Sequence, residues 1–380
     1  MDPIIEFRDF TFQYKSQTEP TLHNINLSIL PGEKILIAGP SGSGKSTLAH
    51  CINALIPAAH PGSYTGTLTV GGAVPKDAGV FGMSKIVGTV LQDTNGQFIG
   101  LSVGEDLAFA LENDAVVQDE MKARVSEIAD IVNVRKFLHH APDELSGGQK
   151  QRVAMGGVLV DDVKILLFDE PLANLDPATG KKTIALIDEI MKAKDVTVII
   201  IEHRLEDVLY RDVDRIVVVN DGRIVADMKP NELLCTDILS GQGIREPLYV
   251  TAMKYAGADI TPEDRPQHIE TMEVARHAGK VRKWFENAPV PAHVNDQAPV
   301  LEVKDVSFAY NAGEPVLENV SLTLRKGEMV SLVGRNGAGK STLSSLICGF
   351  YKPDRGEMFL NGQDISRLSI KERGEHVGYV

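Results

Sequence analysis

Two segments of the chain have the residue types needed to bind phosphate groups. The sequences GPSGSGKST at residues 39–47 and GRNGAGKST at residues 334–342 both fit the pattern G-x-x-x-x-G-K-[S/T]. Glycines let several backbone N–H groups converge on anionic oxygens, and a helix that begins at such a loop adds the positive end of its dipole. The two loops are therefore predicted to bind the phosphates of a nucleotide.

One lysine and one serine of each loop have a specific predicted role. Lys45 and Lys340 are expected to contact the β- and γ-phosphates, while Ser46 and Ser341 are expected to ligate Mg²⁺. The other residues predicted to bind ATP in the two loops are Gly39, Ser41, Gly42, Ser43, Gly44, Thr47, Gly334, Asn336, Gly337, Gly339 and Thr342.

A pair of carboxylates ends the apolar sequence ILLFDEP at residues 165–171, which is typical of a buried strand. Asp169 is positioned to hold hydrated Mg²⁺, and Glu170 to polarise an attacking water as a general base. In isolation such a pair is more often a solvated Asp-Glu turn. In a chain that also has phosphate-binding loops, the catalytic interpretation is favoured.

A second anion-binding motif, LSGGQKQRVA, occupies residues 145–154. A hydroxyl, two glycines and the start of a helix can together bind phosphate, which involves Ser146, Gly147, Gly148 and Gln149. On SGG alone, a helix cap at Ser146 followed by flexible glycines is an equal alternative. The complete LSGGQ followed by QR resembles the signature of the ATP-binding cassette (ABC) ATPases, which favours phosphate binding.

The resemblance to this family implies roles for five further residues. Gln92, in VGTVLQDTNGQF, matches the glutamine that links Mg²⁺ and the attacking water to a transmembrane partner. Asp176, in LANLDP, matches an aspartate at the interface between two cassettes, and His203, ending VTVIIIEH, matches the histidine that contacts the γ-phosphate. Tyr14 and Tyr310 match the aromatic residue that stacks on adenine, and a core position on a strand is an equal alternative for both.

The motifs belong to a repeated sequence. The matching segments are 4–14 with 300–310, 20–48 with 315–343, and 65–72 with 355–362. The chain therefore carries two copies of one module, and the two glycine loops occupy equivalent positions in them. Two matches at equivalent positions make a chance glycine turn a negligible alternative.

The elements that must position these motifs alternate between strands and helices. Apolar strands are predicted at residues 33–39, 164–168, 196–201 and 328–334, and helices at 121–134 and 177–192. This alternation predicts an α/β module with a mainly parallel sheet. The resemblance implies the ABC form of the P-loop NTPase fold, with an antiparallel β subdomain and a helical subdomain.

The repeat divides the chain into three predicted parts, residues 1–229, 230–297 and 298–380. The first is a complete nucleotide-binding domain, which ends after RIVVVNDGRIV, where Asn-Asp-Gly predicts a hairpin turn. The second is a connector with a predicted helix at 270–287 and a proline-rich extended segment at 288–299. The third is the N-terminal part of a second domain, and it ends before the equivalent of Gln92.

The second copy also lacks a signature, a carboxylate pair and a switch histidine. In the ABC family each ATP lies between the phosphate loop of one cassette and the signature of another. We expect that the chain is a fragment of a longer protein, because residues 298–380 would bury their sheet poorly, or else that another chain supplies the signature. Alone, the chain is expected to bind Mg-ATP at Lys45 and to hydrolyse it slowly.

Composition and charge narrow the class of function. The chain has 39 Lys and Arg against 52 Asp and Glu, and a net charge of −13 disfavours nucleic-acid binding through bulk positive charge.

The cysteines and the apolar segments bear on localisation. The three cysteines, Cys51, Cys235 and Cys348, form no CxxC pair and are expected to be reduced thiols of a cytosolic protein. No apolar run approaches the roughly 20 residues needed to cross a bilayer. We expect a peripheral protein that other subunits hold at the cytoplasmic face of the membrane.

Residues 92–113, the REPLY sequence at 245–249 and the tandem layout resemble the ATPase subunits of energy-coupling-factor importers of vitamins and metal ions. The resemblance implies ATP hydrolysis that energises import, with ATP and Mg²⁺ bound. The implied partners are a transmembrane coupling subunit, substrate-binding membrane subunits and a second cassette in cis or in trans, and no nucleic acid.

Two alternative functions stay open. A soluble tandem cassette protein acting on ribosomes or DNA would be expected to have a basic linker or a long coiled-coil insertion, and a non-catalytic chain would only scaffold or regulate.

Overall fold

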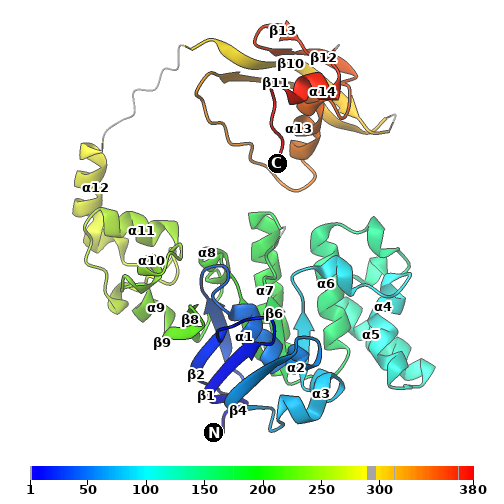
Figure 1. Ribbon diagram of the computed structural model, residues 1–380, viewed down its shortest axis with the longest axis vertical. Helices are drawn as coiled ribbons and strands as arrows, with labels where there is room; N and C mark the ends of the chain where they lie inside the picture. The colour runs from blue at the N-terminus through cyan, green and yellow to red at the C-terminus, as the bar shows by residue number, and fades with distance from the viewer. Residues whose placement is uncertain (1, 174, 289–296, 312, 367) are drawn as a thin grey trace. The chain divides into compact units, whose positions relative to one another are not determined.

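The computed structural model describes residues 2–173, 175–288, 297–311, 313–366 and 368–380 (Figure 1). The chain forms two compact units, Met1–Ala288 and Pro289–Val380, which are called unit 1 and unit 2 below. The boundary at residue 229 between a first domain and a connector remains a prediction. Most of the predicted extended segment 288–299 lies outside the described residues.

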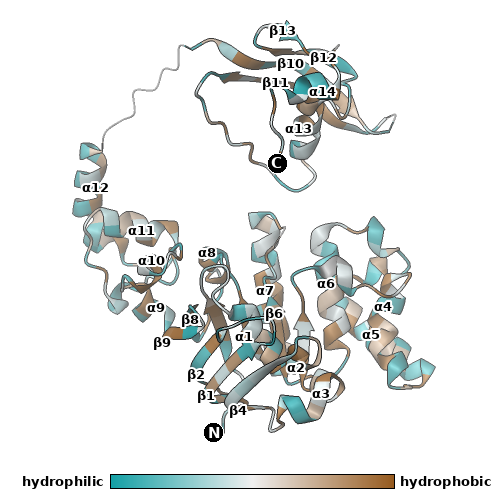
Figure 2. Ribbon diagram, viewed as in Figure 1, coloured by the Kyte–Doolittle hydropathy of each residue, from teal (hydrophilic) through white to brown (hydrophobic). Residues whose placement is uncertain are grey.

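A six-stranded sheet forms the centre of unit 1. Its strands are β3 (Lys34–Ala38), β5 (Val87–Val90), β6 (Ile165–Asp169), β7 (Thr197–Ile201), β8 (Arg215–Asn220) and β9 (Arg223–Met228). Their order is β5-β6-β7-β3-β8-β9, and all are parallel except the edge strand β9. Strands β3, β6 and β7 are buried along their whole length, as parallel strands covered on both faces must be, and Figure 2 shows hydrophobic residues along these central strands.

A three-stranded antiparallel sheet packs against one face of this centre. Its strands are β1 (Ile5–Tyr14), β2 (Leu22–Ile29) and β4 (Gly62–Val70), in the order β2-β1-β4. Three aromatic residues of β1, Phe7, Phe10 and Phe12, are buried, with a register shift between Phe7 and Phe10. They share a hydrophobic core with Ile35 of β3 and with Leu48 of helix α1 (Lys45–Ile52). The strand and the helix that flank the first glycine loop are thus fixed by the same core.

Helices complete the predicted layers. They are α2 (Leu55–Ala58), α3 (Pro75–Ser84), α4 (Val103–Asn113), α5 (Gln118–Ile131), α6 (Gly147–Leu159), α7 (Pro177–Lys194) and α8 (Leu205–Val208), with 3₁₀ turns η1 (Thr94–Gln97), η2 (Arg135–Phe137) and η3 (Pro142–Glu144). Helices α4, α5 and α6 pack on one another as a separate group (Figure 1). Helix α6 approaches this group closely at Gly156, where an added Cβ would lie 2.6 Å from Cδ2 of Leu107. The predicted α/β fold with an antiparallel and a helical subdomain is confirmed.

Residues 230–288 belong to unit 1 and form short helices. These are α9 (Pro230–Leu233), α10 (Ile238–Gly241), α11 (Leu248–Tyr255), η4 (Pro262–Asp264), η5 (Val274–His277) and α12 (Ala278–Asn287). Leu233, Leu234 and Leu239 belong to the same core as β8. The helix predicted at 270–287 is wrong in its first part. The backbone N–H of Glu273 donates to the carbonyl oxygen of Asp264 at 3.0 Å, so this segment is bonded to a distant turn and helix α12 begins only at residue 278.

Unit 2 repeats the antiparallel sheet and the loop-bearing helix. Its elements are β10 (Pro299–Ala309), β11 (Pro315–Arg325), β12 (Arg355–Leu360), β13 (Gln363–Asp364), α13 (Lys340–Cys348) and α14 (Ile370–Gly374). The strand predicted at 328–334 is wrong, because this segment has no strand structure and its Met329 and Val333 are 97% and 86% exposed. The equivalent strand β3 is paired on both sides by β7 and β8, and the described residues of unit 2 contain no such partners.

Among the described residues, no helix combines the length and the apolar composition that a membrane span requires.

Candidate nucleotide-binding site

The first glycine loop connects the end of β3 to the start of α1. Gly42 and Gly44 have φ angles of 78° and 104°, which side chains with a Cβ rarely adopt. At Gly39 an added Cβ would lie 2.1 Å from the carbonyl oxygen of Val219, so a larger residue would displace β8. The backbone geometry therefore requires these glycines, and the loop stands at the N-terminus of α1, where anions bind favourably.

Lys45, the first residue of α1, reaches back across the loop. Its Nζ donates to the carbonyl oxygens of Gly39 at 3.0 Å and Pro40 at 2.8 Å. Burial lowers the pKa of this ammonium group, while the nearby carboxylates Glu170 and Asp169 act in the opposite direction. The lysine is thus held over the loop, where it is positioned to meet a phosphate.

Ser46 and Asp169 bring two oxygen atoms together beside the loop. The hydroxyl of Ser46 donates to Oδ1 of Asp169 at 3.4 Å, and burial raises the pKa of this carboxyl group. The described residues contain no cluster of three or more His, Cys, Asp or Glu that could form a dedicated metal cage. One hydroxyl and one carboxylate fit Mg²⁺, which proteins bind through one or two carboxylates together with substrate phosphates.

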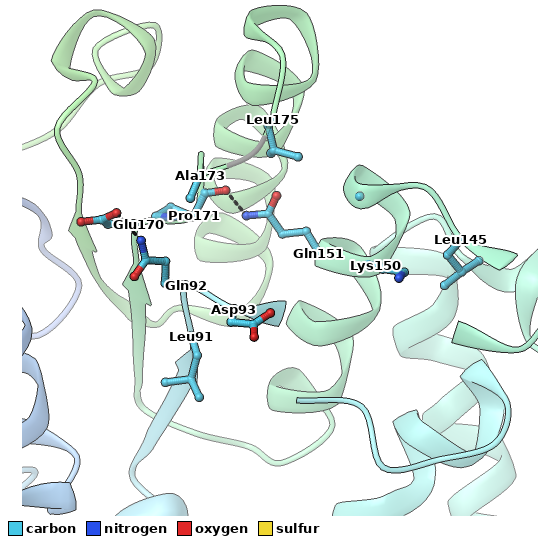
Figure 3. A pocket seen from close by; sticks show the side chains of 11 residues that line it. Leu91, Gln92, Asp93, Leu145, Lys150, Gln151, Glu170, Pro171, Ala173 and Leu175 are labelled. Carbon is cyan, nitrogen blue, oxygen red and sulfur yellow. Dashed lines mark hydrogen bonds between the residues drawn. The ribbon is translucent and has the colours of Figure 1, made fainter. Parts of the chain in front are cut away.

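Glu170 lies between two other predicted site residues. Its Oε2 accepts a hydrogen bond from Nε2 of Gln92 at 2.8 Å, and its Oε1 lies 2.6 Å from Nε2 of His203 (Figure 3 shows the pair of Glu170 and Gln92). The other ring nitrogen of His203, Nδ1, lies 3.1 Å from the carbonyl oxygen of Gly39, so the ring is held between the loop and Glu170. The backbone of Glu170 has φ of 51°, a strained conformation that is common at functional sites.

The loop that carries Gln92 is held by a residue that sequence reasoning missed. Gln97 donates from Nε2 to the carbonyl oxygen of Thr89 at 3.2 Å and accepts from the N–H of Leu91 at 2.9 Å. These bonds join the two ends of the segment between β5 and η1. A glutamine in a polar loop has no pattern that would reveal this role in the sequence.

A cavity of about 170 Å³ connects this loop to the signature motif (Figure 3). Gln92 and Glu170 line it on one side and Gly147 and Gln151 on the other. The side chain of Gln151 is buried and donates from Nε2 to the carbonyl oxygen of Pro171, which ties α6 to the segment after Glu170. In the sequence, Gln151 is recognisable only as part of the extended signature motif. Its hydrogen bond to Pro171 could not be predicted, because it depends on the fold.

The signature and the predicted interface aspartate both lie at helix N-termini. Ser146 is the N-cap residue of α6, and its N–H donates to Oε1 of Gln149 at 2.7 Å. Asp176 caps α7, where its Oδ1 accepts from the N–H groups of Ala178 at 3.0 Å and Thr179 at 3.1 Å. Ser146 and Asp176 thus each stand at the N-cap position of a helix in unit 1. Their predicted contacts to ATP and across a cassette interface remain predictions.

Both predicted adenine-stacking tyrosines contact the end of a glycine loop. The hydroxyl groups of Tyr14 and Thr47 lie 3.0 Å apart, and so do those of Tyr310 and Thr342. The Tyr14 ring also packs edge-on against Phe12, with 4.8 Å between ring centroids. These rings are fixed beside the phosphate loops, and their stacking on adenine remains a prediction.

The second glycine loop has the same local geometry as the first. Gly337 and Gly339 have φ angles of 80° and 87°. Nζ of Lys340 donates at 2.8 Å to the carbonyl oxygens of both Gly334 and Arg335, as Lys45 does to its own loop. Ser341 and Asn336 are exposed, and their predicted contacts to Mg²⁺ and ATP remain predictions.

One buried acid near the site was not predicted. Glu202 follows β7 directly and is 2% exposed, and burial raises its pKa from 4.5 to about 7. The sequence signal was an acidic residue that closes an otherwise apolar strand, VTVIIIEH.

Comparison with known proteins agrees with this geometry. The family model described as ABC transporter matches residues 22–173 and 317–380, and a second model, described as ATP-binding cassette cobalt transporter, matches residues 236–308. ABC transporter ATP-binding proteins of Enterococcus faecalis and Lactiplantibacillus plantarum are 55% and 48% identical over 379 and 378 residues. Both alignments cover 100% of this chain, and 66% and 67% of the relatives. The chain thus spans about two thirds of the length of the curated relatives it matches.

Solved structures show the same fold. The structure of cbiO1 from Clostridium perfringens, described as part of the ABC transporter complex cbiONQ, matches with a TM-score of 0.58 and 29% identity, covering 67% of this chain and 100% of that chain. A dimeric ATP-binding cassette bound to ADP and Pi matches with a TM-score of 0.52 and 29% identity, covering 59% of this chain and 98% of that chain. On its sequence motifs, its fold and these matches, the chain belongs to the ABC transporter family of ATP-binding proteins.

Proposed function

We propose that this chain hydrolyses ATP at the first glycine loop to energise import by a transporter of energy-coupling-factor type, a translocase activity. The observation that carries the proposal is that the phosphate loop, the two carboxylates and the histidine all lie at one edge of the sheet. The loop follows β3, Asp169 ends β6 and Glu170 comes directly after it, and His203 is the second residue after β7. Because β3, β6 and β7 are parallel neighbours, their C-terminal ends bring these groups together.

In the proposed reaction, the loop N–H groups and Lys45 hold the β- and γ-phosphates. Mg²⁺, held by Ser46 and Asp169, would neutralise part of the phosphate charge when bound. Glu170 accepts a proton from the attacking water. Each of its oxygens keeps a lone pair for the water while it contacts Gln92 or His203. Because Gln92 is bonded to Glu170, a change in the position of Gln92 would also move the base.

A second cassette, in cis or in trans, completes the proposed site. The family places each ATP between a phosphate loop and the signature of another cassette, and Ser146 and Gly147 are exposed at the start of α6. Their hydroxyl and N–H groups are accessible to such a partner nucleotide. The loop of unit 2 supplies the equivalent phosphate-binding residues for a second ATP.

A membrane subunit is proposed to dock beside the loop that carries Gln92. A groove of about 280 Å³ lies here, and Val80, Leu91, Gln97 and Val158 are among its lining residues. Large apolar side chains near it are exposed, namely Phe81 at 74%, Ile99 at 63% and Leu101 at 85%. Exposed apolar side chains around a groove fit a helix of a transmembrane coupling subunit. This would hold the chain at the cytoplasmic face of the membrane.

The proposed cargo is a small solute that a separate membrane subunit binds. The match of residues 236–308 to a family described as a cobalt transporter favours a divalent metal ion over a vitamin. The described residues of this chain include no metal-binding cluster of their own, which is consistent with cargo binding elsewhere in the assembly.

The experiment is cobalt uptake into proteoliposomes that contain the protein with its membrane subunits. Lys45→Ala should reduce ATP-driven uptake roughly 100-fold, because the phosphates lose their cation. Lys182→Ala, which removes an exposed lysine of α7, is the matched control and should leave uptake unchanged. Full uptake by the Lys45→Ala protein would refute the role of this loop, and ATP hydrolysis without cobalt transport would refute the cargo.

A further inference from the structure

Glu202 is a buried acid beside the end of β3, the strand that leads into the first phosphate loop. Its backbone N–H donates to the carbonyl oxygen of Ile37 at 3.2 Å, so the residue continues the pairing between β7 and β3 up to the point where β3 enters the loop. Its Oε2 accepts the N–H of the next residue, His203, at 3.0 Å. The carboxyl group therefore fixes the backbone of a predicted catalytic residue.

The charged groups that face Glu202 do not neutralise it. Lys45 approaches from α1, but its Nζ donates to the carbonyl oxygens of Gly39 and Pro40. His203 and Arg204 approach from its own segment, and Glu170 approaches from the end of β6 as a like charge. Within the described part of the chain, no ion pair joins the Glu202 carboxylate to a Lys, Arg or His side chain.

A buried carboxyl group without an ion pair binds a proton more readily than one in water, which is the reason for the raised pKa of Glu202. A bound nucleotide would bring the negative charge of its phosphates to the adjacent loop. Added negative charge favours the neutral form of a neighbouring acid, and nucleotide binding and proton binding then strengthen each other reciprocally.

We propose that Glu202 takes up a proton from solvent when nucleotide binds to the first loop, and that it acts as a positioning residue for His203 in both protonation states. The inference rests on the proposed nucleotide site. The proton joins an oxygen of the carboxylate, and no other bond is made or broken. The carboxyl group can accept from the His203 N–H whether or not it is protonated, so the backbone at His203 keeps its place.

The test is isothermal titration calorimetry of Mg-ADP binding at pH 7.5 in MOPS and in Tris, whose different ionisation heats report the number of protons exchanged. The wild-type protein should take up a fraction of a proton, roughly half, per nucleotide more than Glu202→Gln does. The glutamine is neutral and keeps an acceptor oxygen. The control Glu189→Gln, an exposed residue of α7, should take up protons like the wild type.

A second readout is the pH dependence of affinity. Between pH 6 and 8.5 the Kd of the wild type should rise roughly tenfold relative to that of Glu202→Gln. Equal proton uptake by wild type and Glu202→Gln, with nucleotide bound normally by both, would overturn this inference and leave the proposed function intact. Unchanged nucleotide binding by Lys45→Ala would instead overturn the proposed site. Circular dichroism melting shows that each variant is folded before it is titrated.

Discussion

At the scale of single residues, the proposed general base has a partner at each of its carboxylate oxygens. Glu170 is bonded to Gln92 through one oxygen and lies in contact with His203 through the other, and its backbone has a positive φ angle. A carboxylate in this arrangement is positioned accurately and keeps a lone pair on each oxygen for water. The loop that carries Gln92 and the segment that carries His203 therefore both determine where the base lies.

The buried acid Glu202 makes a prediction about stability and pH. Its folded-state pKa is raised from 4.5 to about 7, so the folded protein holds this proton more tightly than the unfolded chain does. The contribution to stability is fully present below pH 4.5 and is lost as pH rises to about 7, by about 3 kcal/mol.

Glu202→Gln removes this titration. The melting temperature of the variant relative to the wild type should therefore increase as pH rises from 5 to 8, as scanning calorimetry can measure. A difference in melting temperature that stays constant over this range would contradict the assignment of the proton to Glu202. Glu189→Gln, at an exposed site, should show that constant difference.

At the scale of elements, helix α6 links the signature motif to the helical subdomain through close packing at Gly156. An added Cβ there would lie 2.6 Å from Leu107 and 3.3 Å from both Ile128 and Val132, whereas at the neighbouring Gly157 it would meet nothing within 4 Å. The two positions are in the same helix, so both gain the same helix propensity on substitution by alanine. The difference in the free energy of unfolding between the two alanine variants therefore measures the cost of packing at Gly156.

Gly156→Ala should therefore be less stable than Gly157→Ala by about 1–3 kcal/mol in urea denaturation, because the extra methyl group overpacks a well-filled contact. Gly157→Ala should be as stable as the wild type or slightly more so. Equal urea midpoints for the two variants would show that α4 and α5 can move away from α6 without a loss of stability.

The elements also show what the sequence could and could not predict. The glycine loops, the strands that end at Asp169 and Ile201 and the helix that begins at Lys45 follow from local patterns, and the structure contains them. The strand at 328–334 was predicted from the same apolar pattern but does not form, because a central parallel strand depends on neighbours distant in sequence. For the same reason the burial of Glu202 and the bonds of Gln97 could not be predicted, since both depend on tertiary packing.

At the scale of the whole molecule, the proposed site has its phosphate loop, carboxylates and switch histidine in unit 1 and needs a signature from another cassette. The chain of residues 1–380 alone should bind Mg-ATP at Lys45 and turn it over slowly. Its specific rate should increase with protein concentration, because two chains must meet to close a site. A phosphate-release assay over a range of protein concentrations measures this. Fast turnover that is independent of concentration and survives Glu170→Gln would contradict the proposal.

The position of β3 also determines when the site can form during protein synthesis. Ile35 of β3 pairs with Ile199 on one side and with Arg215 on the other, so the strand that carries the loop is completed by residues made much later. Contacts between distant parts of a chain form slowly, and nascent chains expose their apolar segments until the partners arrive. While the ribosome is still adding the residues up to β8, the early strand has no place in a sheet. The first loop therefore gains its fixed place beside Asp169 and His203 late, when β7 and β8 have left the ribosome.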